Sequence, residues 1–166
     1  RDIWNNIGDA LASTANYLNK MGWQSGATWG YEVVAPKGFN YKLVGSERSL
    51  TAWRKLGLKR PGGQSFPRPG ETARLLAPAG AGGPAFLVVK NFQVIKRYNN
   101  ADAYALAVGH LADRLRGGGS FSRDWPDADL RLSDSQLVEV QKQLAARGLY
   151  QGAFDGNIGS GSRAAI

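Results

Sequence analysis

The sequence predicts an α+β fold from the way its apolar residues are spaced. Apolar residues recur at helical spacing over residues 5–21 and again over residues 102–115. Between these stretches, from residue 23 to 96, short apolar or aromatic runs alternate with glycine and proline, which is typical of short strands joined by turns. We therefore expect a helical core with a small β-rich subdomain beside it.

The first helix is predicted to run to about Met21. Asn5 or Asn6 can accept a hydrogen bond from the free N–H groups of its first turn, and Gly22 is a natural stop at its end. The apolar stripe that we expect to face the core consists of Ile7, Leu11, Leu18 and Met21.

The middle part contains four runs that we interpret as strands. They cover residues 29–34, 41–44, 73–76 and 85–89. A short helix is predicted over residues 49–56, where Gly57 ends it, and residues 59–70 are interpreted as a loop. The β-rich subdomain is expected to extend from about residue 29 to 96.

The second long helix is predicted to begin with Asp102 as its cap and to end at about Leu115. Its inward side chains are expected to be Tyr104, Val108, Leu111 and Leu115. Residues 117–131 contain three consecutive glycines, serines and a proline, so we interpret them as a flexible linker. The first domain is therefore expected to span residues 1–116.

A separate helical segment is predicted over residues 132–166. Ser133 and Gln136 have the spacing of a capping box at the start of a helix. The buried side of that helix is expected to include Leu137, Val140, Leu144 and, after its end, Leu149. A glycine-paced loop follows, and another helix is predicted to start near residues 160–162.

Composition narrows the classes of function. The chain of 166 residues has 43% hydrophobic residues, which is typical of a globular protein, and no apolar run long enough to span a bilayer. It has no cysteine, which excludes a disulfide framework and thiol catalysis. The formal net charge of +8 comes from basic residues that are spread rather than clustered, which favours attraction to an anionic polymer of the cell wall over a nucleic-acid interface.

The most informative stretch lies between the last predicted strand and the second long helix. Asn91, Arg97, Tyr98 and Asn99 bring hydrogen-bonding groups together within a few positions, and Tyr98 can also offer the face of its ring. A flat apolar surface beside fixed polar groups is typical of a sugar-binding site. We therefore predict that these four residues bind a glycan.

The same stretch resembles the membrane-bound lytic transglycosylase B family of peptidoglycan-cleaving enzymes. The matching motifs are Asn91–Asn99, Tyr104–Val108 and the segment Ser13–Tyr17, which matches the family's Ser-x-Ala-Asn-Tyr helix. The resemblance covers roughly residues 1–116 and implies a lysozyme-like helical core. It also implies peptidoglycan glycan strands as the partner and the periplasm or cell envelope as the location.

The resemblance further implies a mechanism. Such enzymes cleave the β-1,4 bond between N-acetylmuramic acid and N-acetylglucosamine and form a 1,6-anhydromuramyl product, with one glutamate as general acid. In the family that glutamate precedes the Asp-Ile-Trp segment, which here is residues 2–4. We therefore expect it upstream of Arg1 and expect the present chain alone to be inactive. Ser13 is the predicted catalytic helper, holding the acetamido group of the muramyl sugar.

The segment from residue 132 onward resembles the small all-α peptidoglycan-binding module often attached to wall hydrolases. Its helix with Val140-Gln141 and its Asp155-Gly156 turn carry that resemblance. Because the chain stops at Ile166, inside the last expected helix, we expect the module to be truncated.

Several alternatives stay open at the level of sequence. The protein could be a non-catalytic peptidoglycan-binding protein or a basic nucleic-acid binder, although we predict no nucleic-acid partner. Arg97 could instead form a buried ion pair with an aspartate. We predict no cofactor and no metal, because His110 is isolated and Asn5 stands where a calcium loop prefers an acidic ligand. Peripheral or lipid-anchored membrane association and the oligomeric state are left undecided.

Overall fold

The computed structural model describes residues 2–126, 132–159 and 162. The chain divides into two compact units, residues 1–125 and residues 126–166, and each is described by itself. Within the described residues, no helix has the length and apolar character needed to cross a membrane.

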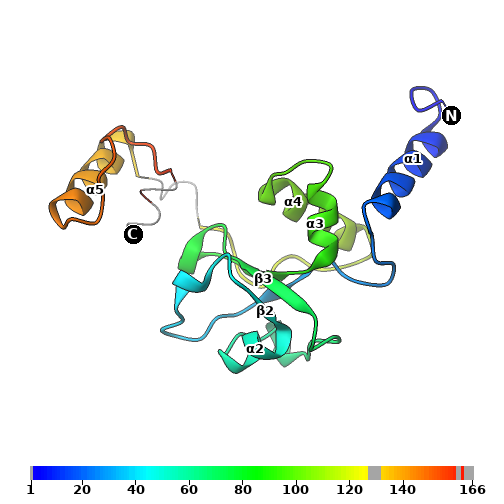
Figure 1. Ribbon diagram of the computed structural model, residues 1–166, viewed down its shortest axis with the longest axis horizontal. Helices are drawn as coiled ribbons and strands as arrows, with labels where there is room; N and C mark the ends of the chain where they lie inside the picture. The colour runs from blue at the N-terminus through cyan, green and yellow to red at the C-terminus, as the bar shows by residue number, and fades with distance from the viewer. Residues whose placement is uncertain (1, 127–131, 160–161, 163–166) are drawn as a thin grey trace. The chain divides into compact units, whose positions relative to one another are not determined.

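The first unit contains a four-stranded sheet with α-helices and short 3₁₀ helices around it (Figure 1). Its strands are β1 (Gly30–Val33), β2 (Glu47–Ser49), β3 (Thr72–Leu76) and β4 (Ala85–Val88). Its α-helices are α1 (Ile7–Lys20), α2 (Leu50–Lys55), α3 (Lys90–Lys96) and α4 (Asp102–Leu115). Short 3₁₀ helices lie at η1 (Tyr41–Leu43), η2 (Pro61–Gly63) and η3 (Gly80–Gly82).

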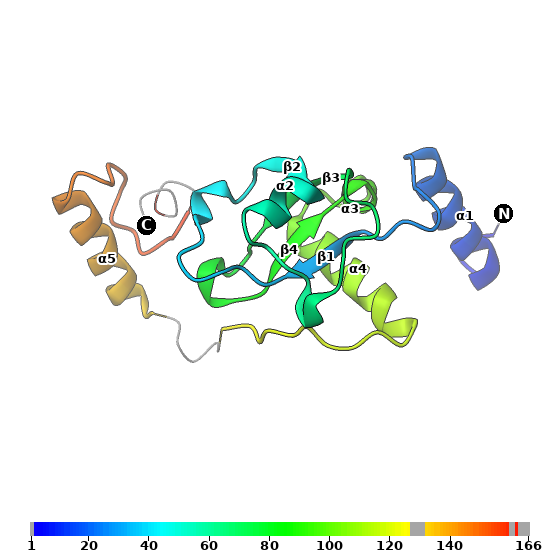
Figure 2. The same ribbon diagram turned by 90° about the horizontal axis from the view of Figure 1, so that it is seen from below.

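The sheet has the order β1-β4-β3-β2 and all its pairings are antiparallel. The predicted mixture of helices and a small sheet is therefore confirmed. Every residue of β4 is buried, because this central strand presents alternate side chains to two cores. Leu87 packs with Trp53 and Leu58 on the side of α2. Phe86 and Val88 pack on the opposite side, where α3 and α4 lie (Figure 1). Figure 2, the view from below, shows the paired strands β1 and β4.

The helix signals were read correctly at α1 and α2. Asn6 caps α1 by accepting a hydrogen bond from the backbone N–H of Asp9 at 3.1 Å. Ser49 caps α2 in the same way through Ala52. Gly57 ends α2 with a φ of +92°, and a Cβ there would lie 2.8 Å from Pro36, so only glycine fits this turn.

Several predicted boundaries were wrong. Residues 41–43 form the 3₁₀ helix η1 rather than a strand, because the Asn40 side chain accepts a hydrogen bond from the backbone N–H of Lys42 and so favours a turn. Residues 90–96, predicted to lie in the β-rich part, form α3. Asp102 is the first residue of α4 rather than its cap, which is Ala101.

The predicted apolar stripes of the long helices are also only partly buried. Ile7 and Leu11 of α1 are 80% and 66% exposed, and no residue of α1 is fully buried. On α4, Leu111 and Leu115 are exposed, whereas Ala105, Leu106 and Gly109 face the core. α4 packs through Ala105, Leu106 and Gly109 rather than through Leu111 and Leu115, which the helical spacing favoured. α1 contacts the rest of the unit through the ring of Tyr17.

The segment predicted as the start of a flexible linker belongs to the first unit. Phe121 packs edge-on against Phe86, with ring centroids 4.9 Å apart, and stacks on His110 at 3.9 Å. Glu32 accepts hydrogen bonds from the backbone N–H and the hydroxyl of Ser122. Residues 121–125 are therefore attached to β1 and β4, and the boundary between the units lies at residue 126.

The second unit contains α5 (Asp134–Ala146) and the loop that follows it. Ser133 and Gln136 form the predicted capping box. Leu144 is buried, but Leu149 is 57% exposed, so its predicted burial was wrong. The helix predicted near residues 160–162 lies, apart from Ser162, outside the described residues.

Candidate functional site

The residues predicted to bind a glycan lie where α3 ends and the chain turns into α4. Tyr98 is the most exposed aromatic side chain of this turn, at 67%. Its ring stacks against Tyr104 of α4, with centroids 6.2 Å apart and planes 13° apart. Tyr17 of α1 meets the same ring edge-on at 6.1 Å. Three tyrosines from three elements thus form one aromatic cluster with an exposed face.

The cluster also fixes α1 against the turn. The hydroxyl of Tyr17 donates a 2.8 Å hydrogen bond to the backbone carbonyl of Arg97. Ser13 lies one helical turn before Tyr17, so the two side chains share a face of α1, and Ser13 is half-buried there. Ser13, Arg97 and Tyr98 are therefore brought to one region by contacts between parts of the chain about 80 residues apart.

Asn99 shapes the turn that carries Tyr98. Its side-chain oxygen accepts a 3.2 Å hydrogen bond from the backbone N–H of Ala101, an arrangement that leads the chain into α4. Its side-chain nitrogen makes no hydrogen bond within the described part of the chain, so it can donate to a ligand.

Arg97 is exposed, and the alternative that it forms a buried ion pair was wrong. The carboxylate of Asp102 is instead shared by Lys96 at 2.7 Å and Arg74 at 2.9 Å. Burial raises the pKa of Asp102, but the hydrogen bonds from Lys96 and Arg74 outweigh that effect and leave its pKa below the usual value. Through these two ion pairs with Asp102, Arg74 and Lys96 link β3, α3 and α4.

Asn91 has a different role from the predicted one. Its side chain is fully buried, and its oxygen accepts a hydrogen bond from the backbone N–H of Gln24 at 2.8 Å. Its nitrogen donates to the backbone carbonyls of Gln24 and Ala27, each at 2.9 Å. All these groups are satisfied inside the protein, so this placement does not fit direct contact with a sugar. Asn91 instead fixes the segment that connects α1 to β1.

Sequence reasoning missed the contribution of Tyr17 and Tyr104. Both lie in the motifs that surround Ser13 and Tyr98, and Tyr17 follows Ser13 at the spacing of one helical turn. That spacing was the available signal for Tyr17. The contact between Tyr98 and Tyr104 depends on the sharp turn at Asn99, which spacing alone does not reveal.

Trp29 is part of the hydrophobic core. It is 6% exposed, and its indole N–H donates a 2.7 Å hydrogen bond to Asp113. Within residues 2–126 and 132–159, no three histidine or acidic side chains lie close enough together to hold a metal ion. The carboxylate of Asp2 accepts the backbone N–H groups of Trp4 and Asn5 and so closes a turn before α1.

The chain is similar to known proteins over the elements that form this site. The family model described as the transglycosylase SLT domain matches residues 1–113. SltB3 from Pseudomonas aeruginosa, solved in complex with NAG-NAM-pentapeptide, is 52% identical with a TM-score of 0.82, over 99% of this chain and 45% of that one. The chain thus spans less than half of the length of SltB3. A search of curated proteins found no match.

Two more distant structures are also similar. Lytic transglycosylase SltB1 from Pseudomonas aeruginosa, in its catenated form, is 26% identical with a TM-score of 0.56, over 70% of this chain and 39% of that one. The Escherichia coli lytic transglycosylase Slt35 in complex with bulgecin A is 28% identical with a TM-score of 0.51, over 65% of this chain and 34% of that one. Because the family model spans more than half of the present sequence, the chain belongs to the transglycosylase SLT family, on the branch that includes the SltB proteins.

Proposed function

We propose that this chain carries the glycan-binding part of a lytic transglycosylase that acts on peptidoglycan. The observation that supports this most strongly is the exposed ring of Tyr98, held between Tyr17 and Tyr104 and followed directly by Asn99. Ser13 lies on the same face of α1 as Tyr17. A sugar ring can lie on such an aromatic face, while hydroxyl and amide groups beside it bind the ring substituents. SltB3 was solved with NAG-NAM-pentapeptide and with NAG-anhNAM-pentapeptide, a glycopeptide with an anhydro sugar.

The proposed reaction cleaves the β-1,4 bond between N-acetylmuramic acid and N-acetylglucosamine. A general acid protonates the leaving glycosidic oxygen, and the C6 hydroxyl of the muramyl sugar attacks its own C1 after losing its proton to the same carboxylate. The product is a 1,6-anhydromuramyl end. An internal nucleophile needs no second carboxylate, because its effective concentration is already high. We assign Ser13 to the acetamido group and Tyr98, Asn99 and Arg97 to the glycan.

The proposal places the general acid, a glutamate, in a part of the protein that lies upstream of these residues. A general acid must hold its proton near neutral pH, which requires a raised pKa. Asp102, the carboxyl group nearest in sequence to Tyr98, has a lowered pKa and is bound by two cations. Glu32 lies on β1 with its carboxylate on Ser122, and Glu47 begins β2, so both belong to the sheet.

A hybrid enzyme tests this proposal. Residues 1–125 would replace the corresponding part of SltB3, which supplies the remainder of a catalytic domain. We expect the hybrid to release muropeptides with 1,6-anhydro ends from sacculi, and the present chain alone to release none. Mass spectrometry distinguishes these products from reducing-end products, which are heavier by one water. Reducing ends would indicate hydrolysis by two carboxylates and would contradict the proposal.

A second candidate function is a peptidoglycan-binding protein without catalysis. The observation that favours it is that none of the glutamates in the described residues lies on α1, α3 or α4, the helices that carry the tyrosine cluster. The same hybrid decides between the two functions. If it binds glycan but releases no muropeptide, residues 1–125 provide binding alone.

We propose that residues 132–166 belong to an all-α peptidoglycan-binding module and that residues 126–131 connect it to the catalytic domain. Support comes from the buried Gln141, whose amide reaches Asp155 at 3.0 Å and accepts the backbone N–H of Gly156 at 2.9 Å. These bonds hold the glycine-paced loop against α5 in a defined shape. Since the substrate is peptidoglycan, we place the protein in the cell envelope, in the periplasm, and leave open a peripheral or lipid-anchored membrane association.

A hybrid enzyme that ends with residues 1–166 of this chain should bind insoluble sacculi more tightly than one that ends at residue 125, while the two should turn over short soluble glycans at similar rates. A tethered module raises the local concentration of polymer without altering the reaction. Co-sedimentation with sacculi measures binding, and it should be repeated at high salt, because the basic charge of the chain also attracts an anionic wall. Unchanged binding at both salt concentrations would contradict a wall-binding role.

A further inference from the structure

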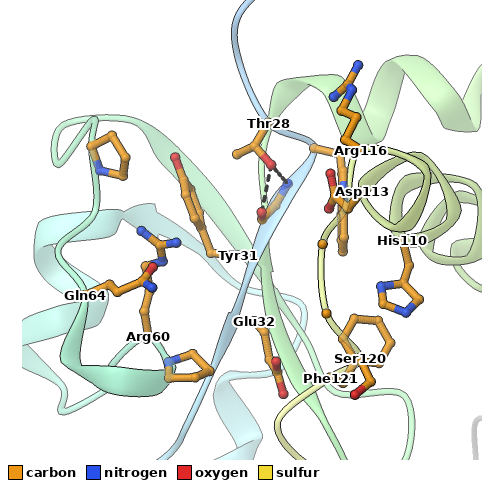
Figure 3. Close-up of a pocket in the computed structure, with 16 residues that line it drawn as sticks. Thr28, Tyr31, Glu32, Arg60, Gln64, His110, Asp113, Arg116, Ser120 and Phe121 are labelled. Atoms are coloured by element: carbon orange, nitrogen blue, oxygen red, sulfur yellow. Dashed lines mark hydrogen bonds between the residues drawn. The ribbon is translucent and has the colours of Figure 1, made fainter.

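A cavity of about 650 Å³ lies in the first unit, lined by residues other than the tyrosine cluster. Three segments far apart in the sequence form its walls: β1 with the residues before it, the loop around η2, and the stretch from α4 to Phe121. In Figure 3, Tyr31, Arg60 and Gln64 stand on one side and Asp113, His110 and Phe121 on the other.

Each wall is fixed by a specific contact. Arg60 holds the η2 loop, because its guanidinium lies 5.1 Å above the ring of Tyr31 and donates a 2.8 Å hydrogen bond to the carbonyl of Ser65. Asp113 is bound to Trp29 through the indole N–H. A cavity with walls fixed in this way loses little conformational entropy when it binds a ligand.

The contacts that fix the walls occupy the acidic groups more fully than the basic ones. Glu32 accepts four hydrogen bonds, three from Ser122 and one from the backbone N–H of Arg123. Asp113 accepts the indole N–H described above. By contrast, Arg116 makes no ion pair or side-chain hydrogen bond with any described residue, and Arg60 uses only one of its five N–H donors.

Other donors line the same space. The side-chain amide of Gln64 and the ring of His110 both border it, and neither has a hydrogen-bond partner among residues 2–126. Burial is the main cause that raises the pKa of Tyr31, so its hydroxyl remains a donor at neutral pH. The cavity therefore has a surplus of donors and two guanidinium groups, which suits a ligand with carboxylate oxygens.

We propose that this cavity binds a short peptide through its carboxylates, with Arg60 and Arg116 as the anchoring cations. The apolar faces of Pro61, Pro67 and Phe121 provide contacts for the side chains of such a peptide. Because this inference rests on the proposed function, the peptide is the stem attached to the muramyl sugar of peptidoglycan. The site would then select glycan strands that carry a stem peptide over strands that lack one.

Binding of three ligands to the whole chain tests the proposal by calorimetry: NAG-NAM-pentapeptide, NAG-NAM without peptide, and the free pentapeptide. Wild-type protein should bind the glycopeptide more tightly than the disaccharide. Arg116→Met, which removes an exposed side chain with no structural contact, should weaken binding of the glycopeptide and of the free peptide by about tenfold and leave the disaccharide unaffected. Arg114→Met is the matched control, since Arg114 lies in the last turn of α4, two residues before Arg116, and does not line the cavity.

A double variant, Arg60→Met with Arg116→Met, should reduce peptide binding further, and a thermal melt shows whether the η2 loop still folds. Equal affinity of wild type for glycopeptide and disaccharide would overturn the proposal. So would equal losses in Arg116→Met and Arg114→Met. These outcomes are separate from failure of the proposed function, because disaccharide binding and release of anhydro products do not depend on the cavity.

Discussion

Replacing Asn91 by leucine is expected to lower the free energy of unfolding of the first unit by about 3–5 kcal/mol. Leucine has a similar shape but cannot bond the N–H and carbonyl of Gln24 or the carbonyl of Ala27. A buried polar group left without a partner costs about 1–3 kcal/mol, and the access of water at the exposed Gln24 and the half-buried Ala27 keeps the total below the sum of three such losses. Urea denaturation followed by tryptophan fluorescence measures this change, because Trp23 and Trp29 flank the segment that Asn91 holds.

Gln93→Leu is the matched control for this prediction. Gln93 lies on the same helix, and its side chain is exposed. The same change from amide to leucine should therefore alter stability by less than about 0.5 kcal/mol. A similar loss of stability in both variants would show that the effect comes from the helix rather than from the three hydrogen bonds of Asn91.

The fold could be predicted where the signal is local. Asn6 was one of two predicted caps of the first helix, Ser133 was predicted to start a capping box, and Ser49 begins the predicted short helix. All three residues cap helices in the structure. Capping could be predicted because it depends on neighbouring residues alone. The burial of helix faces could not be predicted in the same way. Leu11 and Leu115 fit an apolar stripe by spacing, but which face of a helix is covered depends on what packs against it.

In the candidate site, too, local features could be predicted from the sequence and contacts between distant residues could not. The sequence indicated that Tyr98 and Asn99 belong to a polar and aromatic turn, and the structure places them on an exposed surface. The sequence could not show that the Asn91 side chain points inward. An asparagine that binds a sugar and an asparagine that holds a buried loop cannot be told apart in one sequence. The contact between Tyr17 and Tyr98 likewise joins residues that only the folded chain brings together.

The predicted linker, residues 117–131, began too early in the chain, because its first residues pack against the first unit. Glycines and serines at 117–122 are typical of a linker, but Phe121 and Glu32 attach this segment to the first unit. A single aromatic side chain in a glycine-rich stretch was the available signal.

The second large effect is expected on catalysis, from Ser13→Ala and Tyr98→Ala in the hybrid enzyme with SltB3. Ser13 is proposed to hold the acetamido group of the reacting sugar, and the exposed ring of Tyr98 is proposed to support the glycan. A lost contact of this kind costs about 1–3 kcal/mol in the transition state, which is a factor of roughly 5–150 in kcat/KM. Tyr98 is exposed, and the hydrogen bond from Tyr17 to Arg97 that holds α1 against the turn is kept in both variants, so thermal stability should change little.

The most direct test of the glycan-binding role of this chain is kcat/KM for release of 1,6-anhydromuropeptides by the hybrid enzyme, compared among three variants. Thr14→Ala is the control, because Thr14 neighbours Ser13 on α1 and bonds only the carbonyl of Ala10 in its own helix. We predict that Ser13→Ala and Tyr98→Ala each lose at least about fivefold in kcat/KM while Thr14→Ala keeps the value of the parent hybrid. Unchanged kcat/KM in both Ser13→Ala and Tyr98→Ala would contradict the assignment of this surface to the substrate.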